Sequence, residues 1–217
     1  MGEVSSNYAK YQTGNPLMQA VIRRFLRRIV AHVRDARPRR VVDLGCGEGL
    51  VARELAALPF ELEYRGLEID PAAVEIARRE VPNLSFEHAD LLAAPPDEPG
   101  WADLALSLEV LEHLDDPAAG VARIREWTGQ MAIVSVPWEP FFRAGNFARG
   151  KYLGRLGNHP EHLQQFGPRS FRRLLEAEFR VVRVETCFPW LIGLAAAPRS
   201  ADCGYDHVGS RSTHMVS

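Results

Sequence analysis

The chain has 217 residues, of which 26 are Lys or Arg and 28 are Asp or Glu, so its formal net charge is only −2. This balance excludes a strongly basic or strongly acidic protein, and the overall charge therefore indicates no particular partner. A hydrophobic content of 46% over this length is sufficient for one globular domain with a full core.

The cysteines and the hydropathy pattern favour a cytoplasmic protein. Cys46, Cys187 and Cys203 are scattered and odd in number, which argues against a disulfide framework or a zinc site. The N-terminus, MGEVSSNYAKYQ, lacks the apolar segment of a signal peptide. The longest apolar candidate, residues 188–198, is shorter than the roughly 18 to 20 residues of a membrane span. We therefore expect no transmembrane segment.

Residues 1–15 are polar and predict a flexible lead, and an amphipathic helix follows them. Its apolar positions recur at helical spacing: Met18, Val21, Ile22, Phe25, Leu26, Ile29, Val30 and Val33. Its other face carries arginines: Arg23, Arg24, Arg27, Arg28 and Arg34. Surface helices commonly carry such charge, so a solvated face is the first interpretation, and contact with a phosphate-bearing substrate is the alternative.

Strands and helices then alternate along the chain. We expect strands at 41–44, 63–69, 84–90, 102–108, 131–137, 180–186 and 190–198, and helices near 49–58, 71–81, 116–127 and 168–179. This order predicts a three-layer α/β domain over residues 16–198 with a mostly parallel sheet. Residues 138–167 break the alternation as an insert, and the tail at 199–217 has no periodicity and is expected to be disordered.

A glycine-rich segment, VVDLGCGEG, joins the first strand to the next helix. Its glycines, at positions 45, 47 and 49, permit a tight turn and let a ligand approach the backbone closely. The helix that follows offers its N-terminus to a polar group. The spacing is G-x-G-x-G and no Lys-Ser or Lys-Thr pair follows, so a phosphate-binding P-loop is disfavoured.

Two carboxylates follow the next two strands. Glu68 ends the second strand, where an acidic side chain can accept hydrogen bonds from both hydroxyls of a ribose, and Asp90 ends the third. Ligands of open α/β sheets bind at this carboxyl edge. Helix caps or solvated strand ends are the alternative explanation for both residues. Asp43 differs from them, because a carboxylate inside an apolar strand is costly without partners.

The segments VVDLGCGEG, RGLEID, HADL and ADLALSLEVLEHL together resemble the class I S-adenosylmethionine-dependent methyltransferases. The resemblance implies a Rossmann-like sheet of seven strands with only the last strand antiparallel, and S-adenosylmethionine as the cofactor. It implies these cofactor-binding residues: Asp43, Gly45, Cys46, Gly47, Glu68, Ile69, Asp90, Leu91 and Leu108. In one departure, residues 127–130 replace the family's usual Lys-Pro-Gly-Gly turn before the fifth strand, on the edge far from the cofactor.

The fourth predicted strand ends in SLEVLEHLDD, which concentrates ionisable groups beside the expected methyl position. The motif Glu-x-x-Glu-His is similar to that of the ubiquinone-biosynthesis O-methyltransferases, which implies His113 as a base or substrate-orienting group. Helix capping is the alternative for Glu112 and His113, and Asp115 and Asp116 suit the start of the next helix.

A metal site is a second interpretation of this motif. The motif Glu-x-x-Glu-His also resembles that of small-RNA 3′-terminal 2′-O-methyltransferases, which hold a divalent metal through such a motif and a later histidine. The candidate ligands here are Glu109, Glu112, His113 and, further on, His159 and His162. A metal-free small-molecule enzyme is favoured over this interpretation, since the later histidine also occurs in the metal-free branch.

The insert interleaves aromatic side chains with cations. Three interpretations compete: a lid over a small-molecule substrate, a patch that touches a membrane or a lipid-linked substrate, and a surface for RNA stacking. The first is favoured, and nucleic acid is the least favoured partner. We expect a monomer or a homodimer.

Two other function classes compete with methyl transfer. A non-catalytic partner subunit that only binds cofactor is disfavoured because Asp43 and Glu68 are both present. A nucleotide-dependent dehydrogenase is disfavoured by the glycine spacing.

Overall fold

The computed structural model of the chain describes residues 15–93, 96–138 and 166–198. Residues 1–14 of the predicted flexible lead, nearly all of the insert and the tail lie outside these residues. Within them, no helix is both long enough and apolar enough to cross a membrane.

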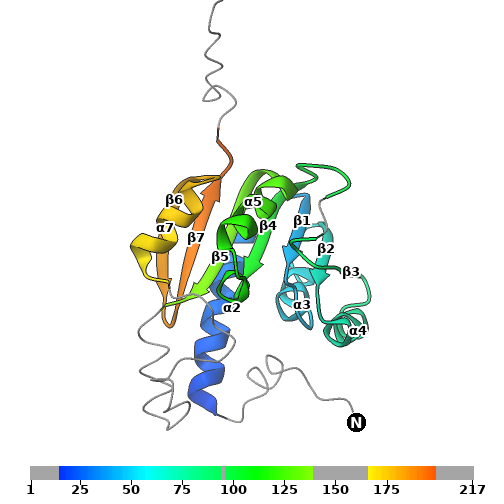
Figure 1. Cartoon of the computed structure of the whole chain (residues 1–217). Helices are drawn as coiled ribbons and strands as arrows, with labels where there is room; N and C mark the ends of the chain where they lie inside the picture. The colour runs from blue at the N-terminus through cyan, green and yellow to red at the C-terminus, as the bar shows by residue number, and fades with distance from the viewer. Residues whose placement is uncertain (1–14, 94–95, 139–165, 199–217) are drawn as a thin grey trace, which may run out of the picture.

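The described residues form a seven-stranded sheet in the order β3-β2-β1-β4-β5-β7-β6 (Figure 1). The strands are β1 (Arg40–Leu44), β2 (Glu63–Glu68), β3 (Ser85–His88), β4 (Ala102–Leu108), β5 (Thr128–Pro137), β6 (Arg180–Cys187) and β7 (Trp190–Ala196). Neighbouring strands from β3 to β5 pair in parallel, whereas β7 is antiparallel to both β5 and β6. The predicted mostly parallel Rossmann-like sheet with one antiparallel strand is confirmed.

Most helices begin where the sequence offers a capping side chain and a proline. The helices are α2 (Pro16–Ala36), α3 (Leu50–Ala56), α4 (Pro71–Glu80), α5 (Pro117–Trp127) and α7 (Pro168–Glu176), with a 3₁₀ turn, η1 (Leu111–His113). Asn15, Asp70 and Asp116 accept backbone N–H bonds at the starts of α2, α4 and α5, and a proline follows each. Asp116 therefore has the helix-start role expected from the sequence.

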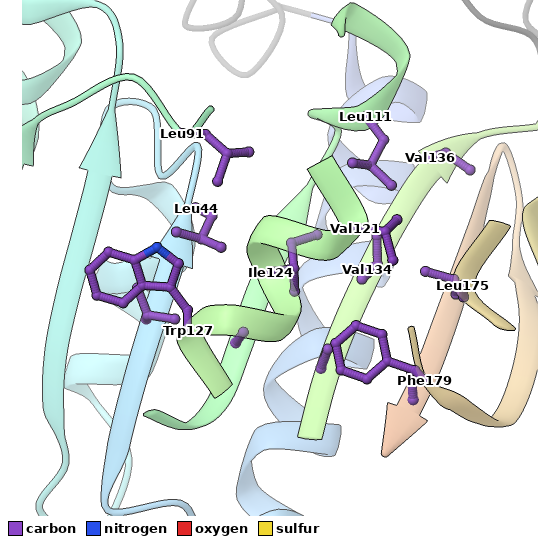
Figure 2. Close-up of a cluster of buried hydrophobic side chains, with 14 of the residues drawn as sticks. Leu44, Leu91, Leu111, Val121, Ile124, Trp127, Val134, Val136, Leu175 and Phe179 are labelled. Carbon is purple, nitrogen blue, oxygen red and sulfur yellow. The ribbon is translucent and has the colours of Figure 1, made fainter. Parts of the chain in front are cut away.

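Two hydrophobic clusters place the helices in layers on both faces of the sheet. Ile29 of α2, Leu55 of α3 and Val74 of α4 pack in one cluster. The other cluster contains α5 and α7, and Figure 2 shows Ile124 and Trp127 of α5 directed toward the sheet. All these side chains are nearly or completely inaccessible, so each helix buries its apolar stripe and leaves its polar face outward.

The fifth strand begins earlier than predicted. β5 starts at Thr128, directly after α5, whereas the sequence suggested a loop there and a strand from 131. The hydroxyl of Thr128 donates to the carbonyl oxygen of Ala102 at 3.0 Å and accepts from the backbone N–H of Gln130 at 3.2 Å. The first of these bonds joins the amino ends of β4 and β5, and the opposite, carboxyl edge is left for the site.

Candidate functional site

The glycine turn after β1 has two positions with different surroundings. Gly45 has φ +87° and Gly47 has φ +54°, so both occupy the left-handed region that favours glycine. A Cβ atom on Gly45 would lie 2.3 Å from Cγ2 of Val110, whereas one on Gly47 would meet no atom within 4 Å. Gly45 therefore packs against the segment that follows β4, while Gly47 leaves space for a ligand to approach its backbone.

The carboxylate of Glu68 is fixed at the end of β2 by two backbone donors. The N–H of Gly47 donates to Oε2 at 2.9 Å and the N–H of Asp70 donates to Oε1 at 3.0 Å. Each carboxylate oxygen keeps a second lone pair, so the group can still accept hydrogen bonds from a vicinal diol. Ile69, the next residue, is 63% exposed and offers an apolar surface beside that carboxylate.

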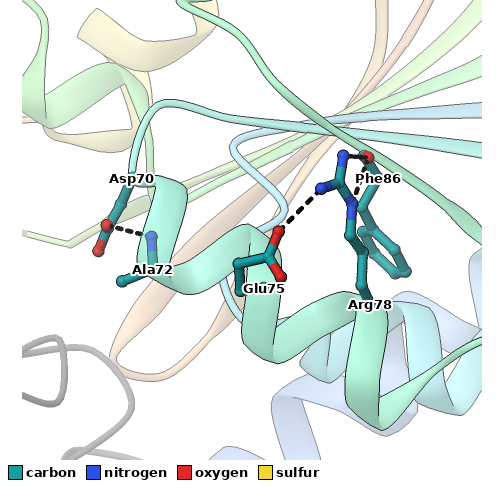
Figure 3. Close-up of polar contacts among 5 residues, drawn as sticks. All are labelled: Asp70, Ala72, Glu75, Arg78 and Phe86. Carbon is teal, nitrogen blue, oxygen red and sulfur yellow. Dashed lines mark hydrogen bonds and ion pairs between the residues drawn. The ribbon is translucent and has the colours of Figure 1, made fainter. Parts of the chain in front are cut away.

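Helix α4 holds this corner of the sheet in place (Figure 3). Asp70 accepts from the backbone N–H of Ala72 at 2.9 Å, which caps the helix directly after Ile69. Further along, the guanidinium of Arg78 donates twice to the carbonyl oxygen of Phe86, at 3.1 and 2.7 Å, and bonds Glu75 at 2.9 Å. α4 is therefore tied to the edge strand β3, which ends just before Asp90.

Asp90 and Leu91 lie at the next position along the carboxyl edge. The backbone N–H of Ala89 donates to the carbonyl oxygen of Glu68 at 2.9 Å, which keeps the ends of β2 and β3 together. Asp90 is exposed, and its Oδ1 accepts from the N–H of Leu92 at 2.8 Å. Leu91 is buried at 8% exposure.

The side chain of Cys46 is directed away from the edge. It is buried against Gly66, where an added Cβ would lie 2.8 Å from its sulfur. Burial raises the pKa of the Cys46 thiol far above its ordinary value, and the nearby carboxylates of Asp43 and Glu68 add to the effect. The thiol is therefore a neutral packing group. Only the backbone of Cys46 can contact a ligand at the edge.

Asp43 is a buried carboxylate with one strong partner. The hydroxyl of Tyr64 donates to its Oδ2 at 2.8 Å, while its Oδ1 accepts no hydrogen bond from any described residue. Burial raises the pKa of Asp43 to about 7, against the opposing effect of the Tyr64 bond. Oδ1 therefore has unused capacity to accept a bond from a cationic or N–H-bearing ligand.

Glu109 adopts an unusual backbone conformation where β4 ends. Its φ of +61° lies in the left-handed region, which is uncommon for a residue other than glycine and often marks functional segments. The indole N–H of Trp190 donates to its Oε2 at 2.6 Å, and the hydroxyl of Ser135 donates to its Oε1 at 3.3 Å. The carboxylate is therefore held by residues from β5 and β7.

The remaining groups of the Glu-x-x-Glu-His motif lie in η1. Glu112 is fully buried, and His113 is partly exposed, three residues after the Val110 that packs against the glycine turn. No group of three or more His, Cys, Asp or Glu side chains within 15–93, 96–138 and 166–198 has the arrangement of a metal site. His159 and His162, the further candidates for metal ligands, lie outside those ranges.

The structure thus brings the glycine turn, Glu68, Asp90 and the segment 109–113 to one edge, across the four adjacent strands β3, β2, β1 and β4. Leu108 also ends its strand there, partly exposed. Sequence reasoning missed Tyr64, Ser135 and Trp190. The alternation of Tyr64 with polar neighbours in β2 was compatible with a core position, and nothing in the sequence linked Trp190 to Glu109.

The donors and acceptors at this edge fit the adenosylated methionine that the sequence resemblance implied. The space over Gly47, the fixed carboxylate of Glu68 and the exposed Ile69 suit a backbone contact, a ribose diol and an aromatic base. The unused Oδ1 of Asp43 suits the cationic part of that molecule.

Comparisons with known proteins show that this chain is similar to methyltransferases. The chain is 38% identical to the trans-aconitate 2-methyltransferase of Methylobacterium nodulans over 96 residues, which are 44% of this chain and 36% of that protein. It is 29% identical to the ubiquinone biosynthesis O-methyltransferase of Albidiferax ferrireducens over 97 residues, 42% of this chain and 38% of that protein. The matched segments thus span little more than a third of these relatives.

The fold is also that of solved methyltransferases. The magnesium protoporphyrin IX methyltransferase of Synechocystis, solved with bound S-adenosylhomocysteine, superposes with a TM-score of 0.69 at 19% identity, covering 89% of this chain and 95% of that one. Residues 16–184 match the family described as a methyltransferase domain, and binding of S-adenosylmethionine is typical of that family. The chain therefore belongs to the methyltransferase-domain family and has the class I S-adenosylmethionine-dependent methyltransferase fold.

Proposed function

We propose that this protein is an S-adenosylmethionine-dependent methyltransferase that acts on a small-molecule or lipid-linked acceptor. The observation that carries the proposal is the carboxylate of Glu68, which two backbone N–H groups fix beside the open space over Gly47. A P-loop does not use an acid in this place. A dehydrogenase does use one, but its glycine turn has the spacing G-x-G-x-x-G and not the G-x-G-x-G found here.

Each residue at the carboxyl edge has a defined role in binding. Glu68 accepts from the ribose hydroxyls and Ile69 covers the adenine, while Asp90 accepts from the adenine amino group and Leu91 packs beside it. The backbone of residues 45–47 and the carboxylate of Asp43 line the methionine part, and the backbone at Leu108 meets its amino group. When bound, S-adenosylmethionine supplies an electrophilic methyl group for in-line transfer.

His113 is the candidate for proton removal from the acceptor. A neutral imidazole can accept a proton from a hydroxyl or amine as that atom becomes a nucleophile. The rest of the rate enhancement comes from holding the acceptor in line and excluding water from it. Trans-aconitate, the acceptor in the name of one relative, is a small molecule, which supports the proposed acceptor class.

Calorimetric titration with S-adenosylhomocysteine tests the cofactor assignment. Glu68→Ala should weaken binding by at least about tenfold, because it removes both acceptors for the diol and the bonds that fix Gly47. Glu63→Ala is the matched control, since Glu63 is exposed at the opposite end of the same strand. Equal affinities for wild type and Glu68→Ala would overturn the assignment.

A further inference from the structure

One face of α2, between its first turn and Arg28, carries exposed cationic and apolar side chains. Leu17, Arg24 and Arg28 are separated by seven and four residues, so they share one face of the helix. All three are exposed, Leu17 to 73%. Phe188, in the turn between β6 and β7, is 48% exposed. We call Leu17, Arg24, Arg28 and Phe188 the α2 rim.

The α2 rim lies at the carboxyl edge of the sheet, beside the candidate site. The ring of Phe25 on α2 lies 4.6 Å from that of Trp190, the first residue of β7 and the partner of Glu109. Burial raises the pKa of the Cys187 thiol, and the positive charges of Arg24 and Arg28 oppose that shift from nearby. Figure 1 shows the first turns of α2 extending beyond the ends of β4 and β5.

Like-charged arginines lie one helical turn apart on this part of α2. Arg24 and Arg28 are four residues apart, as are Arg23 and Arg27, and such like-charge pairs are unfavourable on a helix.

Intramolecular ion pairs offset only part of this charge. Glu185 of β6 bonds Arg28 at 3.1 Å and His32 at 2.8 Å, while Arg24 makes no ion pair with any described residue. The α2 rim therefore keeps the positive charge of Arg24 unbalanced by any ion pair with a described residue, although the whole chain has a net charge of −2. This local excess is suited to an external anionic surface.

We propose that the α2 rim docks the protein onto an anionic phospholipid bilayer and so brings a lipid-borne acceptor to the carboxyl edge of the sheet. Arginines attract anionic headgroups, and apolar side chains beside them enter the boundary between headgroups and acyl chains. The exposed Leu17 favours a bilayer over RNA, because an aliphatic side chain has no stacking partner on a nucleic acid. The link to the acceptor rests on the proposed function, whereas docking itself does not.

Co-sedimentation of the full chain with lipid vesicles tests this proposal. Wild type should bind phosphatidylcholine vesicles that contain phosphatidylglycerol, bind pure phosphatidylcholine weakly, and lose affinity as salt rises. The double variant Arg24→Gln/Arg28→Gln should bind the anionic vesicles roughly 25-fold more weakly, since each arginine near the surface contributes roughly fivefold. Leu17→Gln should also weaken binding while keeping its dependence on salt.

The matched control changes two arginines at the other end of α2 and just after it. Arg34→Gln/Arg39→Gln removes the same charge from positions far from the carboxyl edge and should bind vesicles like wild type. Equal losses of vesicle affinity in both double variants would overturn the proposal. A wild-type protein that does not bind anionic vesicles would also overturn it. Tighter binding to single-stranded RNA that depends on Arg24 and Arg28 but not on Leu17 would overturn it in favour of a nucleic acid.

Titration of the same proteins with S-adenosylhomocysteine separates docking from the proposed function. All variants of the α2 rim should keep wild-type affinity for that ligand. A wild type that binds vesicles but not S-adenosylhomocysteine would refute the proposed function and leave the docking surface supported.

Discussion

The indole N–H of Trp190 donates to the carboxylate of Glu109 at 2.6 Å and thereby joins the first residue of β7 to the residue that follows β4. The two residues are 81 positions apart in the chain. Because Glu109 has a left-handed backbone, its carboxylate turns toward β5 and β7, and the chain then enters the turn that carries Glu112 and His113. This bond gives Glu109, the first ionisable residue after the buried strand β4, a structural partner.

Trp190→Phe should destabilise the protein more than Trp127→Phe. Both tryptophans are almost fully buried, at 7% and 6% exposure, but the indole N–H of Trp127 donates to no described residue. Both changes remove the same atoms, and only the first removes a donor to a carboxylate. Urea unfolding should show an excess cost of about 2 kcal/mol for Trp190→Phe. Equal costs would show that the bond contributes nothing.

Substitutions in the glycine turn should separate folding from binding. Gly45→Ala should cost about 3 kcal/mol of unfolding free energy, since it combines a left-handed backbone with a collision against Val110. Gly47→Ala should cost about 1 kcal/mol, because only the backbone conformation is disfavoured. Urea unfolding of the two variants checks this order, and equal costs would contradict it.

Gly47→Arg tests what the space over this glycine accommodates. The protein should fold with a stability close to that of Gly47→Ala and lose measurable affinity for S-adenosylhomocysteine, because the side chain fills the approach to the backbone. Calorimetry and urea unfolding check the two halves of this prediction. Affinity close to that of wild type would place the cofactor elsewhere.

Asp43 predicts a pH dependence of stability. Its pKa is about 7 in the folded protein, against 3.8 for an ordinary aspartate, so the folded state binds the proton more tightly than the unfolded state does. The free energy of unfolding should therefore fall as pH rises from about 4 to about 7 and level off above that range, by an amount on the order of 4 kcal/mol. Asp43→Asn should remove this contribution.

The measurement is the difference in unfolding free energy between Asp43→Asn and wild type across that range. The variant should gain relative stability as pH rises, because wild type alone must ionise a buried carboxylate. A difference that stays constant with pH would mean that Asp43 titrates normally in the fold.

His113→Ala should lower turnover and leave affinity for S-adenosylhomocysteine unchanged. The reason is that the proposed role concerns the acceptor proton and not the cofactor. Steady-state kinetics with the acceptor and calorimetry check the two quantities. Unchanged turnover would reduce His113 to a residue of the turn before α5.

The periodicity of the sequence was sufficient for the elements that position the site. Apolar strands followed by capped, proline-initiated helices predicted a mostly parallel sheet, and the family resemblance predicted its one antiparallel strand. The start of β5 was predicted wrongly, because it depends on hydrogen bonds of the Thr128 hydroxyl to β4 that no local pattern reveals.

The positions of individual candidate residues were easier to predict than their hydrogen-bond partners. Glu68 and the glycines follow from their places at strand ends, which the chain order fixes. The bond from Tyr64 to Asp43 and that from Trp190 to Glu109 depend on strand register and on side-chain direction, which arise only when distant segments pair. The positive φ of Glu109 is likewise a tertiary effect, since glutamate does not favour it locally.

Transfer of a labelled methyl group tests the central claim most directly. The protein is incubated with methyl-labelled S-adenosylmethionine and a fractionated bacterial extract, with and without a chelator, and label is counted in small-molecule, lipid, protein and RNA fractions. The proposed function predicts label in the small-molecule or lipid fraction that persists with chelator and is lost in Gly47→Arg. Label in RNA that disappears with chelator would contradict it and make Glu109, Glu112 and His113 part of a metal site.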